Sequence, residues 1–544
     1  MRTRTTFLLL IPMLLLARVA SAIPAHLWSH NYGDFDSQYA GACFADPSGN
    51  VILCGSFYGS VNIATPYTSL GRRDAIVAKW DTSGNPLWSK RVGFKSVDTG
   101  WSGTTDVSGN VILVGSTGPH PNERDAFIAK YSPTGTQQWI KTFIATPDSV
   151  AYVEVAATDA TKHIHVAGQF NGSINLGGAT LVAQGENDVF WAEFDAGGNH
   201  IWSKAFHASA GIGELGGIGV DPSGQPVLFG DFGGSVNFGG GLLNTVGSSN
   251  LFLVKLDTDG NHLWSRRFGE TGDQGAQALA TDPSGRICIT GEMDGNINFG
   301  GGVLTPVAAP DIFLAMFNSA GTHLWSKRFG GADSENGYSV AFASNNDVLL
   351  SAIGYGPGAI DFGGGPLAAP TDLYATFVAR FFSSNGAHRW STKFDGTENI
   401  YGLVDEYNGQ LIMGGELLGT VNLGGSDLIS GGSGDFFVAR FADHITAAGP
   451  TLARASLGQN TPNPFNPSTQ IAYTLAAPAH AVIEIVDVSG GVVARIDEGT
   501  QPAGAHSTMW NGRDERGVPV ASGVYFYRLS GMPDVAARKM VLLK

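Results

Sequence analysis

The sequence predicts an all-β protein: a seven-bladed β-propeller closed by its N-terminal strand and followed by a small Ig-like β-sandwich. Three observations lead to this prediction. A tryptophan-containing phrase recurs at nearly even spacing, three further strand-like segments follow most copies, and the last repeat stops one strand short. No stretch carries a sustained apolar period of 3.6 residues, so few helices are expected. Glycine is abundant, with 76 among 544 residues, as turn-rich β proteins require.

The first 22 residues have the composition of a secretory signal peptide. Two arginines precede an apolar run over residues 7–16, and an Ala-Ser-Ala cleavage site ends at residue 22. About ten apolar residues are too few to cross roughly 30 Å of hydrocarbon as a helix. The mature chain is therefore expected to begin near Ile23, outside the cytoplasm. An uncleaved membrane anchor is the alternative.

The charge of the chain limits its partners. The net charge is −15, and removal of the three arginines in residues 1–22 takes it to −18. An acidic chain without a basic cluster repels phosphate backbones and anionic lipids. Nucleic acid is not an expected partner, no transmembrane segment is expected after signal removal, and the protein is expected to be a monomer.

Residues 23–442 contain the repeats. The phrase, written "HLWSKRFG" at residues 323–330, returns with its tryptophan at intervals of 51 to 65 residues, at Trp28, Trp88, Trp139, Trp202, Trp264, Trp325 and Trp390. Self-similarity at a nearly fixed period indicates that one supersecondary unit has been copied.

Each repeat predicts four strands. The copy "HLWSRRFG" is followed by "AQALATD", the turn "PSG", "RICITGEM", a glycine-rich loop and "DIFLAMF". Four strands per unit is the count of a propeller blade. The small-residue strand after the phrase is expected nearest the axis. The Trp and Phe of the phrase are expected to fill the wider gaps between the outer parts of the blades.

The two ends of the array predict how it closes. The first copy begins at the strand around Trp28, and the last stops after "DFFVARF" at residues 435–441, with no tryptophan strand behind it. Pairing of these two segments would complete the seventh sheet and cover an exposed edge. A linear solenoid, the alternative, would leave two open ends.

The repeats resemble bacterial SBBP-type β-propeller repeats over about residues 26–442. The shared elements are the turn "DPSGN", a third strand of the type "DIFLAMF" and the phrase "LWSKRF". The resemblance implies the propeller fold. It implies no particular activity, because propellers carry many unrelated functions.

The C-terminal segment has a different character. After a linker over residues 443–458, five or six alternating strands joined by Gly, Asn and Pro turns predict a small sandwich over residues 459–544. Trp510 is expected in its core, together with Tyr525 and Tyr527 or their neighbours.

The motifs "NPFNPST", "NGRDERGVPVASGVYFYRL" and "RKMVLLK" resemble the C-terminal sorting domain of type IX-secreted proteins, which is related to the Ig-like module of flagellar hook-capping proteins. The resemblance implies recognition by a secretion machinery and passage across an outer membrane. The protein would then be secreted and extracellular, or attached to the outer-membrane surface. An ordinary accessory sandwich is the alternative.

The cysteines leave two outcomes open. Cys43 and Cys54 flank the first "PSGN" turn, and pairing of Asp46 with Val51 would place them opposite each other. Opposed strand positions have Cβ atoms about 4.5–5.5 Å apart, slightly wide for a disulfide but within reach. Either a Cys43–Cys54 disulfide or two buried thiols is expected. Cys288 is expected to be inert core.

Neither a metal nor another cofactor is expected. "HIH" places His163 and His165 on one strand face, which could begin a zinc site, but no third ligand with suitable spacing follows. "DTDGN" at residues 257–261 resembles the opening of a calcium loop without its distal glutamate, so structural calcium has no further support. The aspartates that begin the first turn of each repeat are expected to accept hydrogen bonds from the turn's own amides. They are Asp46, Asp106, Asp159, Asp221 and Asp282.

One face of the propeller is the better candidate for binding. Strand order places the long glycine-rich loops and the loops after each tryptophan strand on the same face, and loops on rigid scaffolds carry function. The candidate ligand-facing residues there are Asp34, Asp36, Trp101, Glu270, Asp273, Asp333, Glu335 and Glu398.

The function favoured by the sequence is recognition or adhesion by a secreted or cell-surface propeller, with a glycan or protein ligand. No nucleophile elbow, P-loop, dinucleotide fingerprint or HExxH motif is present, and the expected axial strands consist of Gly, Ala and Val. No catalytic residue is therefore assigned. The alternative is a secreted hydrolase or lyase acting on polysaccharide or peptide at the propeller mouth. A spacer without a ligand is a third possibility.

Overall fold

The computed structural model describes residues 24–442 and 456–544, apart from residues 95, 119–123, 147–148, 186, 309, 357, 369–372, 476–478, 502–503 and 531–536. The chain divides into two compact units, Met1–His444 and Ile445–Lys544. Every regular element of the described residues is a β-strand, which confirms the all-β prediction. No helix among them could span a membrane. The expected signal peptide and residues 443–455 of the expected linker lie outside the described residues.

The first unit contains seven four-stranded antiparallel sheets, numbered here in chain order. Sheet 1 is β2 (Gln38–Ala45), β3 (Val51–Phe57), β6 (Asp74–Trp80) and β7 (Pro86–Val92). Sheet 2 is β8 (Thr99–Thr105), β9 (Val111–Thr117), β10 (Asp125–Tyr131) and β11 (Gln137–Phe143). Sheet 3 is β12 (Ala151–Thr158), β13 (Ile164–Phe170), β16 (Asp188–Phe194) and β17 (His200–Phe206). Sheet 4 is β18 (Gly217–Val220), β19 (Pro226–Phe232), β22 (Asn250–Leu256) and β23 (His262–Phe268).

The remaining sheets repeat this pattern. Sheet 5 is β24 (Gln274–Thr281), β25 (Ile287–Met293), β28 (Asp311–Phe317) and β29 (His323–Phe329). Sheet 6 is β30 (Glu335–Phe342), β31 (Val348–Tyr355), β34 (Tyr374–Phe381) and β35 (His388–Phe394). Sheet 7 is β36 (Ile400–Tyr407), β37 (Gln410–Leu417), β40 (Asp435–Ala442) and β1 (Ala25–Tyr32).

Short two-stranded ribbons form in the glycine-rich loops between the second and third strands of six sheets. They are β4 (Ser60–Asn62) with β5 (Pro66–Thr68), β14 (Ser173–Ile174) with β15 (Leu181–Val182), β20 (Ser235–Asn237) with β21 (Leu242–Asn244), β26 (Ile297–Asn298) with β27 (Val303–Leu304), β32 (Ala359–Asp361) with β33 (Pro366–Ala368), and β38 (Thr420–Val421) with β39 (Leu428–Ile429).

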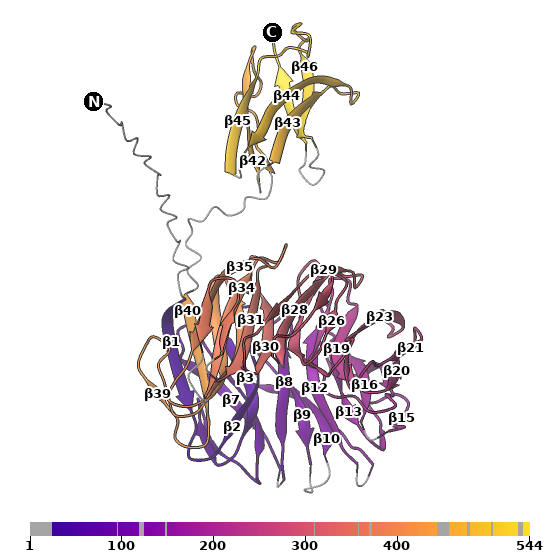
Figure 1. Cartoon of the computed structure of the whole chain (residues 1–544), viewed down its shortest axis with the longest axis vertical. Coiled ribbons are helices and arrows are strands. Elements are labelled where there is room, and N and C mark those ends of the chain that lie inside the picture. Colours follow the sequence, from indigo (N-terminus) through magenta and orange to yellow (C-terminus); the bar gives the residue numbers. More distant parts are fainter. Residues whose placement is uncertain are drawn as a thin grey trace, which may run out of the picture. The chain divides into compact units, whose positions relative to one another are not determined.

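Sheet 7 joins the two ends of the unit. β1 pairs antiparallel with β40, from Ala25 opposite Ala442 to Tyr32 opposite Phe436, and Figure 1 shows indigo β1 beside orange β40. The first strands of the sheets also touch in succession. β2 contacts β8, and the contacts continue through β12, β18, β24, β30 and β36 back to β2. The arrangement is propeller-like.

The recurring phrase packs each sheet against the next. The indole nitrogen of Trp88 donates a hydrogen bond to the carbonyl of Pro133, 3.0 Å away, in the turn before the fourth strand of sheet 2. Trp28, Trp139, Trp202, Trp264 and Trp325 make the equivalent bond to the next sheet. The indole nitrogen of Trp390 has no partner among the described residues. The equivalent turn of sheet 7 would join β40 to β1, but these paired strands lie at opposite ends of the unit's sequence, so no such turn exists.

The histidine of the phrase is structural. In five copies its Nε2 lies 2.9–3.1 Å from the serine hydroxyl three residues later, as in His26 with Ser29. The aspartates of the first turns behave as expected, since Asp46 Oδ1 accepts from the amides of Ser48 and Asn50 at 2.8 and 2.9 Å. The "DTDGN" segment is the same kind of turn, because Asp257 Oδ1 accepts from the amides of residues 259 and 261.

Cys43 and Cys54 are not opposed, so of the two expected outcomes the structure shows two buried thiols rather than the disulfide. The turn closes with the amide of Asp46 donating to the carbonyl of Asn50, and strand pairing therefore begins with Ala45 opposite Val51. Cys43 consequently lies opposite Leu53. Because successive strand residues point to opposite faces, the two thiols enter different hydrophobic clusters. All three cysteines are free and buried.

Thiol labelling checks this arrangement. Iodoacetamide is expected to leave Cys43, Cys54 and Cys288 unmodified in the native protein, because all three are buried and burial raises the pKa of each thiol. Unfolding without reductant is expected to expose three reactive thiols, measured by intact mass. Only one labelled thiol after such unfolding would indicate the disulfide instead.

The second unit is a sandwich of two sheets. One sheet contains β41 (Ser456–Leu457), β42 (Thr469–Leu475) and β45 (Gly504–Trp510), and the other contains β43 (Ala479–Val486), β44 (Val492–Gln501), β46 (Gly523–Leu529) and β47 (Arg538–Leu542). Their facing sides enclose a core that includes Trp510, Tyr525 and Tyr527, as the sequence predicts.

Candidate functional site

β-Bulges in the innermost strands hold aromatic and polar side chains. The pairing of first and second strands skips Trp101 in β8, Glu154 in β12, Gln277 in β24 and Tyr338 in β30. A bulge re-aims a side chain and is over-represented beside functional sites. Gln277 and Tyr338 line a central cavity of about 210 Å³, to which the innermost parts of all seven sheets contribute. The symmetry of the repeats is thus broken at the centre of the unit.

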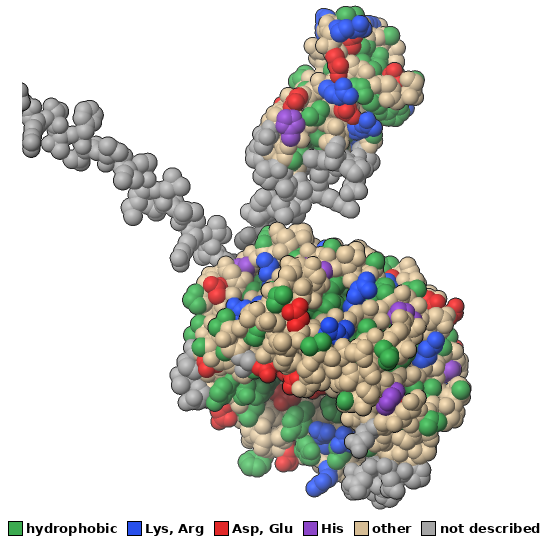
Figure 2. All heavy atoms as spheres, turned by 45° about the vertical axis from the view of Figure 1, so that its right-hand side comes forward, with side chains coloured by type: hydrophobic (Ala, Val, Ile, Leu, Met, Phe, Trp, Pro, Cys, Tyr) green, Lys and Arg blue, Asp and Glu red, His purple; other side chains and the backbone are tan. Residues whose placement is uncertain are grey.

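A second hollow, of about 580 Å³, shares Gln277 with the central cavity and lies between sheets 4 and 5. Five of its lining residues are acids: Glu214, Asp231, Asp273, Glu292 and Asp294. Figure 2 shows acidic and basic side chains interspersed with hydrophobic ones on the visible face. The aromatic and polar side chains around these two hollows form what we call the mouth cluster: Trp101, Tyr152, Glu154, Glu214, Asp231, Gln277, Glu292 and Tyr338.

Glu154 is the most perturbed acid of the mouth cluster. Burial raises its pKa to about 8, and the carboxylates of Glu214 and Asp231 add to the rise. Gln169 Nε2 donates to its Oε1 at 2.9 Å, whereas its Oε2 is buried without a hydrogen-bond partner among the described residues. Glu154 is therefore protonated at neutral pH and can donate a hydrogen bond.

The neighbouring acids are held by backbone and side-chain donors. Asp231 accepts from the amide of Glu214 at 3.0 Å and from the hydroxyl of Ser249 at 3.1 Å, and burial raises its pKa to about 6. Gln277 Nε2 donates to Glu214 Oε2 at 3.1 Å. Burial raises the pKa values of Glu214 and Glu292 as well.

Groups from distant sheets act on one another at this site. Burial raises the pKa of Tyr338 to about 12, with further contributions from Glu416, Tyr401 and Glu214. Glu416 accepts from the amide of Ala40 at 2.9 Å, and burial raises its pKa to about 7. Acids from two different sheets, Glu214 and Glu416, thus lie close enough to Tyr338 to affect its pKa.

The aromatic side chains give the site its apolar part. The rings of Trp101 and Tyr152 have centroids 6.0 Å apart, with an angle of 34° between their planes, and Trp101 is 38% exposed. An open aromatic face beside neutral and ionised carboxyl groups can stack on a ring and exchange hydrogen bonds with hydroxyls. This combination of an apolar surface with a few polar groups is typical of ligand sites.

Of the eight sequence-predicted residues, Trp101 belongs to the mouth cluster, and Asp273 lines the hollow between sheets 4 and 5. Asp34 and Asp333 brace loops, since their Oδ2 atoms accept from the amides of Ser60 and Gly358 at 2.6 and 2.5 Å. Threonines make the equivalent bond in sheets 3, 5 and 7, through Thr146, Thr271 and Thr397.

The other four predicted residues are not brought together with these. Asp36 is exposed, and its amide donates to Asp34. Glu335 is buried and accepts from the amide of Gly331 at 3.1 Å; burial raises its pKa to about 7. Glu270 lines a separate hollow of about 570 Å³, and Glu398 is exposed.

The sequence contains a signal for the acids that were missed. Near the end of each second strand, the residue after glycine is Ser56 in sheet 1 and Ser116 in sheet 2, but Gln169, Asp231, Glu292 and Glu416 in sheets 3, 4, 5 and 7. This asymmetry is readable once the repeats are aligned. The expectation that only Gly, Ala and Val line the centre is wrong, because the bulges add Gln277 and Tyr338 to the lining.

A separate group of titratable side chains occupies the other end of β13. Asp159, His163, His165 and Glu193 meet there. Three of them, Asp159, His165 and Glu193, place one potential metal-ligating atom each within 4.8 Å of the others.

Comparisons with known proteins identify part of the chain. Residues 463–534 match the family model of the FlgD Ig-like domain. The chain is 21% identical over 540 residues to an uncharacterized WD repeat-containing protein of Acanthamoeba polyphaga mimivirus, covering 77% of this chain and 38% of that protein. It is 24% identical over 406 residues to the regulatory protein FlaEY of Caulobacter vibrioides, covering 69% and 42%. The chain thus spans about two fifths of the length of these relatives.

Two solved structures are similar at low scores. The polysaccharide lyase Uly1 has a TM-score of 0.41 at 9% identity, covering 79% of this chain and 94% of that one. The quinohemoprotein alcohol dehydrogenase of Comamonas testosteroni has a TM-score of 0.37 at 10% identity, covering 76% of each chain. Neither likeness carries an activity over to this chain.

Proposed function

We propose that the chain is a secreted or cell-surface protein whose first unit is a seven-bladed β-propeller closed by β1, and that it recognises a glycan at the mouth cluster. Its C-terminal Ig-like domain serves export. The observation that carries the recognition role is that four of the five bulges in the innermost strands hold unlike side chains, each in a different sheet, whereas the fifth holds Gly41.

Closure of the propeller is supported by three features. The fourth strand of sheet 7 comes from the N-terminal end of the unit, and the innermost strands touch in an unbroken cycle. In the described part of the chain, the indole nitrogen of Trp390 lacks the hydrogen bond that the other tryptophans of the phrase make. Its acceptor would be a turn between β40 and β1, and these two strands are not connected in sequence. A linear stack would instead leave the first and last sheets without a neighbour on one side.

A glycan suits the mouth cluster better than a strongly acidic ligand. The acids Glu214, Asp231 and Glu292 would repel an anionic ligand. Hydroxyl groups of a neutral sugar can donate to ionised carboxylates and accept from a protonated one, while Trp101 and Tyr152 offer aromatic faces. Export is supported by the signal-like residues 1–22 and by the Ig-like domain at residues 463–534.

Replacement of Trp101 by alanine tests the recognition role. On a glycan array, the purified wild type is expected to bind a defined set of neutral oligosaccharides. Trp101→Ala is expected to weaken this binding by about tenfold or more, since a stacked aromatic ring contributes about 0.5–1.5 kcal/mol beyond the apolar area that it buries. Phe94→Ala, which removes an exposed aromatic ring outside the mouth cluster, is the matched control. Equal binding by Trp101→Ala and wild type would count against this site.

A hydrolase or lyase is the second candidate, and one observation favours it. Glu154, protonated at neutral pH, lies near the acids Glu214 and Asp231, as a general acid beside a carboxylate would. For a hydrolase or lyase, the wild type is expected to cleave the oligosaccharides that it binds, and Glu154→Gln is expected to abolish cleavage while retaining binding. Binding without product formation, followed by mass spectrometry, leaves recognition as the function.

A further inference from the structure

Sheets 1, 2 and 4 share a buried ion pair at their first turn. The pairs are Lys79–Asp46 at 2.6 Å, Lys130–Asp106 at 3.0 Å and Lys255–Asp221 at 2.7 Å. In each pair the lysine comes from the third strand and the aspartate begins the turn between the first and second strands. A positive charge thus belongs beside this turn in the ordinary repeat.

Sheet 3 departs from this pattern at two positions. Glu193 stands where sheets 1, 2 and 4 have lysine, so the turn aspartate Asp159 meets a second carboxylate. Opposite Glu193 on the paired strand is His165. The residues in the same register position of sheets 1, 2, 4, 6 and 7 are aliphatic: Ile52, Ile112, Val227, Leu349 and Ile412.

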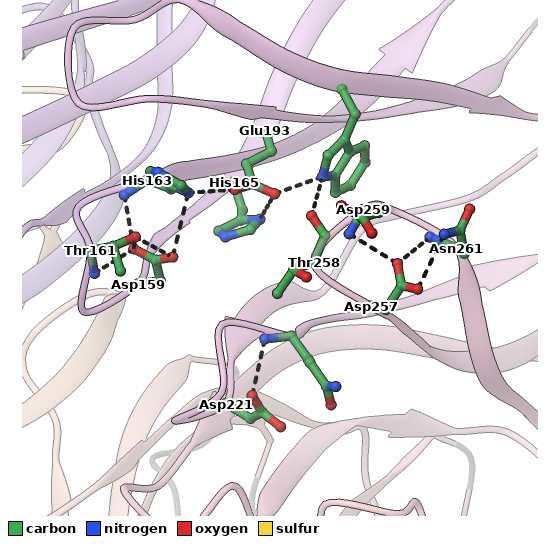
Figure 3. A network of polar contacts seen from close by, with 12 residues as sticks. Asp159, Thr161, His163, His165, Glu193, Asp221, Asp257, Thr258, Asp259 and Asn261 are labelled. Atoms are coloured by element: carbon green, nitrogen blue, oxygen red, sulfur yellow. Dashed lines mark hydrogen bonds and ion pairs between the residues drawn. The ribbon is translucent and has the colours of Figure 1, made fainter.

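The four side chains of this histidine cluster, Asp159, His163, His165 and Glu193, are turned toward one another (Figure 3). His163 Nδ1 lies 2.6 Å from Glu193 Oε1 and 3.7 Å from Asp159 Oδ2. His165 Nδ1 lies 3.9 Å from Glu193 Oε2. His165 is fully buried, and neither of its ring nitrogens has a hydrogen-bond partner among the described residues.

A protonated His163 could replace the missing lysine, because it already reaches Glu193. That arrangement leaves the buried imidazole of His165 unexplained. A buried polar ring without a hydrogen bond is unfavourable, whereas isoleucine at the same position in sheets 1, 2 and 7 has no such requirement. The buried imidazole is accounted for if the lone pair of one of its ring nitrogens binds a metal ion.

We propose that Asp159, His165 and Glu193 bind one divalent transition-metal ion, for which Zn²⁺ is the probe, with His163 at the solvent side of the site. Imidazole and carboxylate are both zinc ligands, at about 2.0–2.2 Å from the ion. The 3.9 Å between His165 Nδ1 and Glu193 Oε2 is too long for a hydrogen bond and within the span of two such bonds. The ion supplies the positive charge that lysine provides in sheets 1, 2 and 4.

The site is separate from the mouth cluster and does not depend on the proposed recognition role. His165 lies near the start of β13, and Gln169, which contacts Glu154, lies near the end of the same strand. Trp202 links the histidine cluster to sheet 4, since its Nε1 donates both to Glu193 Oε2 and to the carbonyl of Thr258. A bound ion would therefore tie the first turn of sheet 3 to its third strand, beside the packing contact with sheet 4.

Metal titration of the full chain tests the proposal. After dialysis against EDTA, isothermal titration with ZnCl₂ is expected to give one tight ion per chain, and Zn²⁺ is expected to raise the melting temperature, because a ligand that binds only the folded state stabilises it. Mg²⁺ and Ca²⁺ are expected not to compete, since they prefer oxygen ligands. Co²⁺ in the site is expected to show visible absorption that Zn²⁺ abolishes.

Two substitutions restore what other sheets contain and are therefore expected to fold. His165→Ile introduces the isoleucine of sheets 1, 2 and 7, and Glu193→Lys introduces the lysine that pairs with Asp159 as in sheets 1, 2 and 4. Each is expected to weaken zinc binding by more than about 100-fold. This loss is larger than the loss caused by replacing a residue that only supports a metal ligand. His207→Gln, which removes the His207–Asp188 pair elsewhere in sheet 3, is the matched control and is expected to bind zinc like the wild type.

Two results would contradict the proposed zinc site. Absence of stoichiometric zinc binding to the wild type would overturn the proposal, and so would full retention of binding by His165→Ile. Near-ultraviolet circular dichroism of each variant shows whether it keeps the native packing. If one of the two variants does not fold, zinc binding by the other variant and the Co²⁺ absorption of the wild type show whether the site exists.

Discussion

Deletion of residues 23–33 is expected to lower the melting temperature of the first unit by on the order of 10 °C or more, or to leave it unfolded. The deletion removes β1 and exposes the edge of β40, which pairs with β1 along its whole length. It also removes Trp28, whose indole bonds sheet 7 to the turn at Thr82 of sheet 1. The loss is a substantial part of the roughly 5–15 kcal/mol that stabilises a typical folded protein. Calorimetry of the wild type and the deletion variant measures it.

A crosslink tests the same contact in the other direction. Ala25 lies opposite Ala442 at the end of the β1–β40 pair, so the double variant Ala25→Cys, Ala442→Cys is expected to form a disulfide. Oxidation should raise the melting temperature, since a crosslink that closes a long loop restricts the unfolded chain by roughly 2–4 kcal/mol. Reductant should reverse the gain. An unchanged melting temperature in both the deletion and the oxidised variant would show that β1 does not fasten the unit.

Replacement of Glu154 by glutamine is expected to stabilise the protein at pH 8.5 and to have little effect near pH 5. Burial raises the pKa of Glu154 from 4.5 to about 8. Between these values the folded protein holds a proton that the unfolded chain has released, so the free energy of unfolding falls as the pH rises. At roughly 1.4 kcal/mol for each pKa unit, the upper limit is several kcal/mol, reduced by the partial exposure of the side chain.

Urea unfolding at pH 5, 7 and 8.5 measures this effect. Glutamine cannot lose a proton, so Glu154→Gln is expected to lose part of the fall in stability that the wild type shows across this range. The remaining fall comes from other buried acids, including Asp231 and Glu416. Glu270→Gln, at a site outside the mouth cluster, is the control and is expected to follow the wild-type profile. Parallel profiles for Glu154→Gln and the wild type would mean that Glu154 is ionised in the folded protein.

The architecture of the first unit was predictable because the sequence of one repeat occurs in several similar copies. Four strands per repeat, the outward position of the tryptophans and the turns held by aspartates follow from periodicity and turn chemistry, and the structure contains all three. The core position of Trp510 likewise follows from strand alternation. Features that each repeat shares are averaged over many copies, so a local error in one copy does not change the prediction.

Features that depend on one residue of register, or on a single copy, were not predictable. Contrary to the sequence-based prediction, Cys43 does not lie opposite Cys54, because the strands pair from Ala45 opposite Val51 and not from Asp46 opposite Val51. Bulges at Trp101 and Glu154 have no clear sequence signal. The histidine cluster was missed because its ligands do not follow "HIH" along the chain: Asp159 precedes it, and Glu193 comes from the neighbouring strand.

The position of β1 has a consequence for the order in which the chain folds. Asn31 donates a hydrogen bond to the carbonyl of Ile429, 398 positions later, so β1 is synthesised long before the rest of sheet 7 and stays unpaired until that sheet has emerged from the ribosome. Contacts of such long sequence separation slow folding. Sheet 7 therefore stays one strand short until β40 has been synthesised, and the first unit reaches its final packing only after that strand is available to pair with β1.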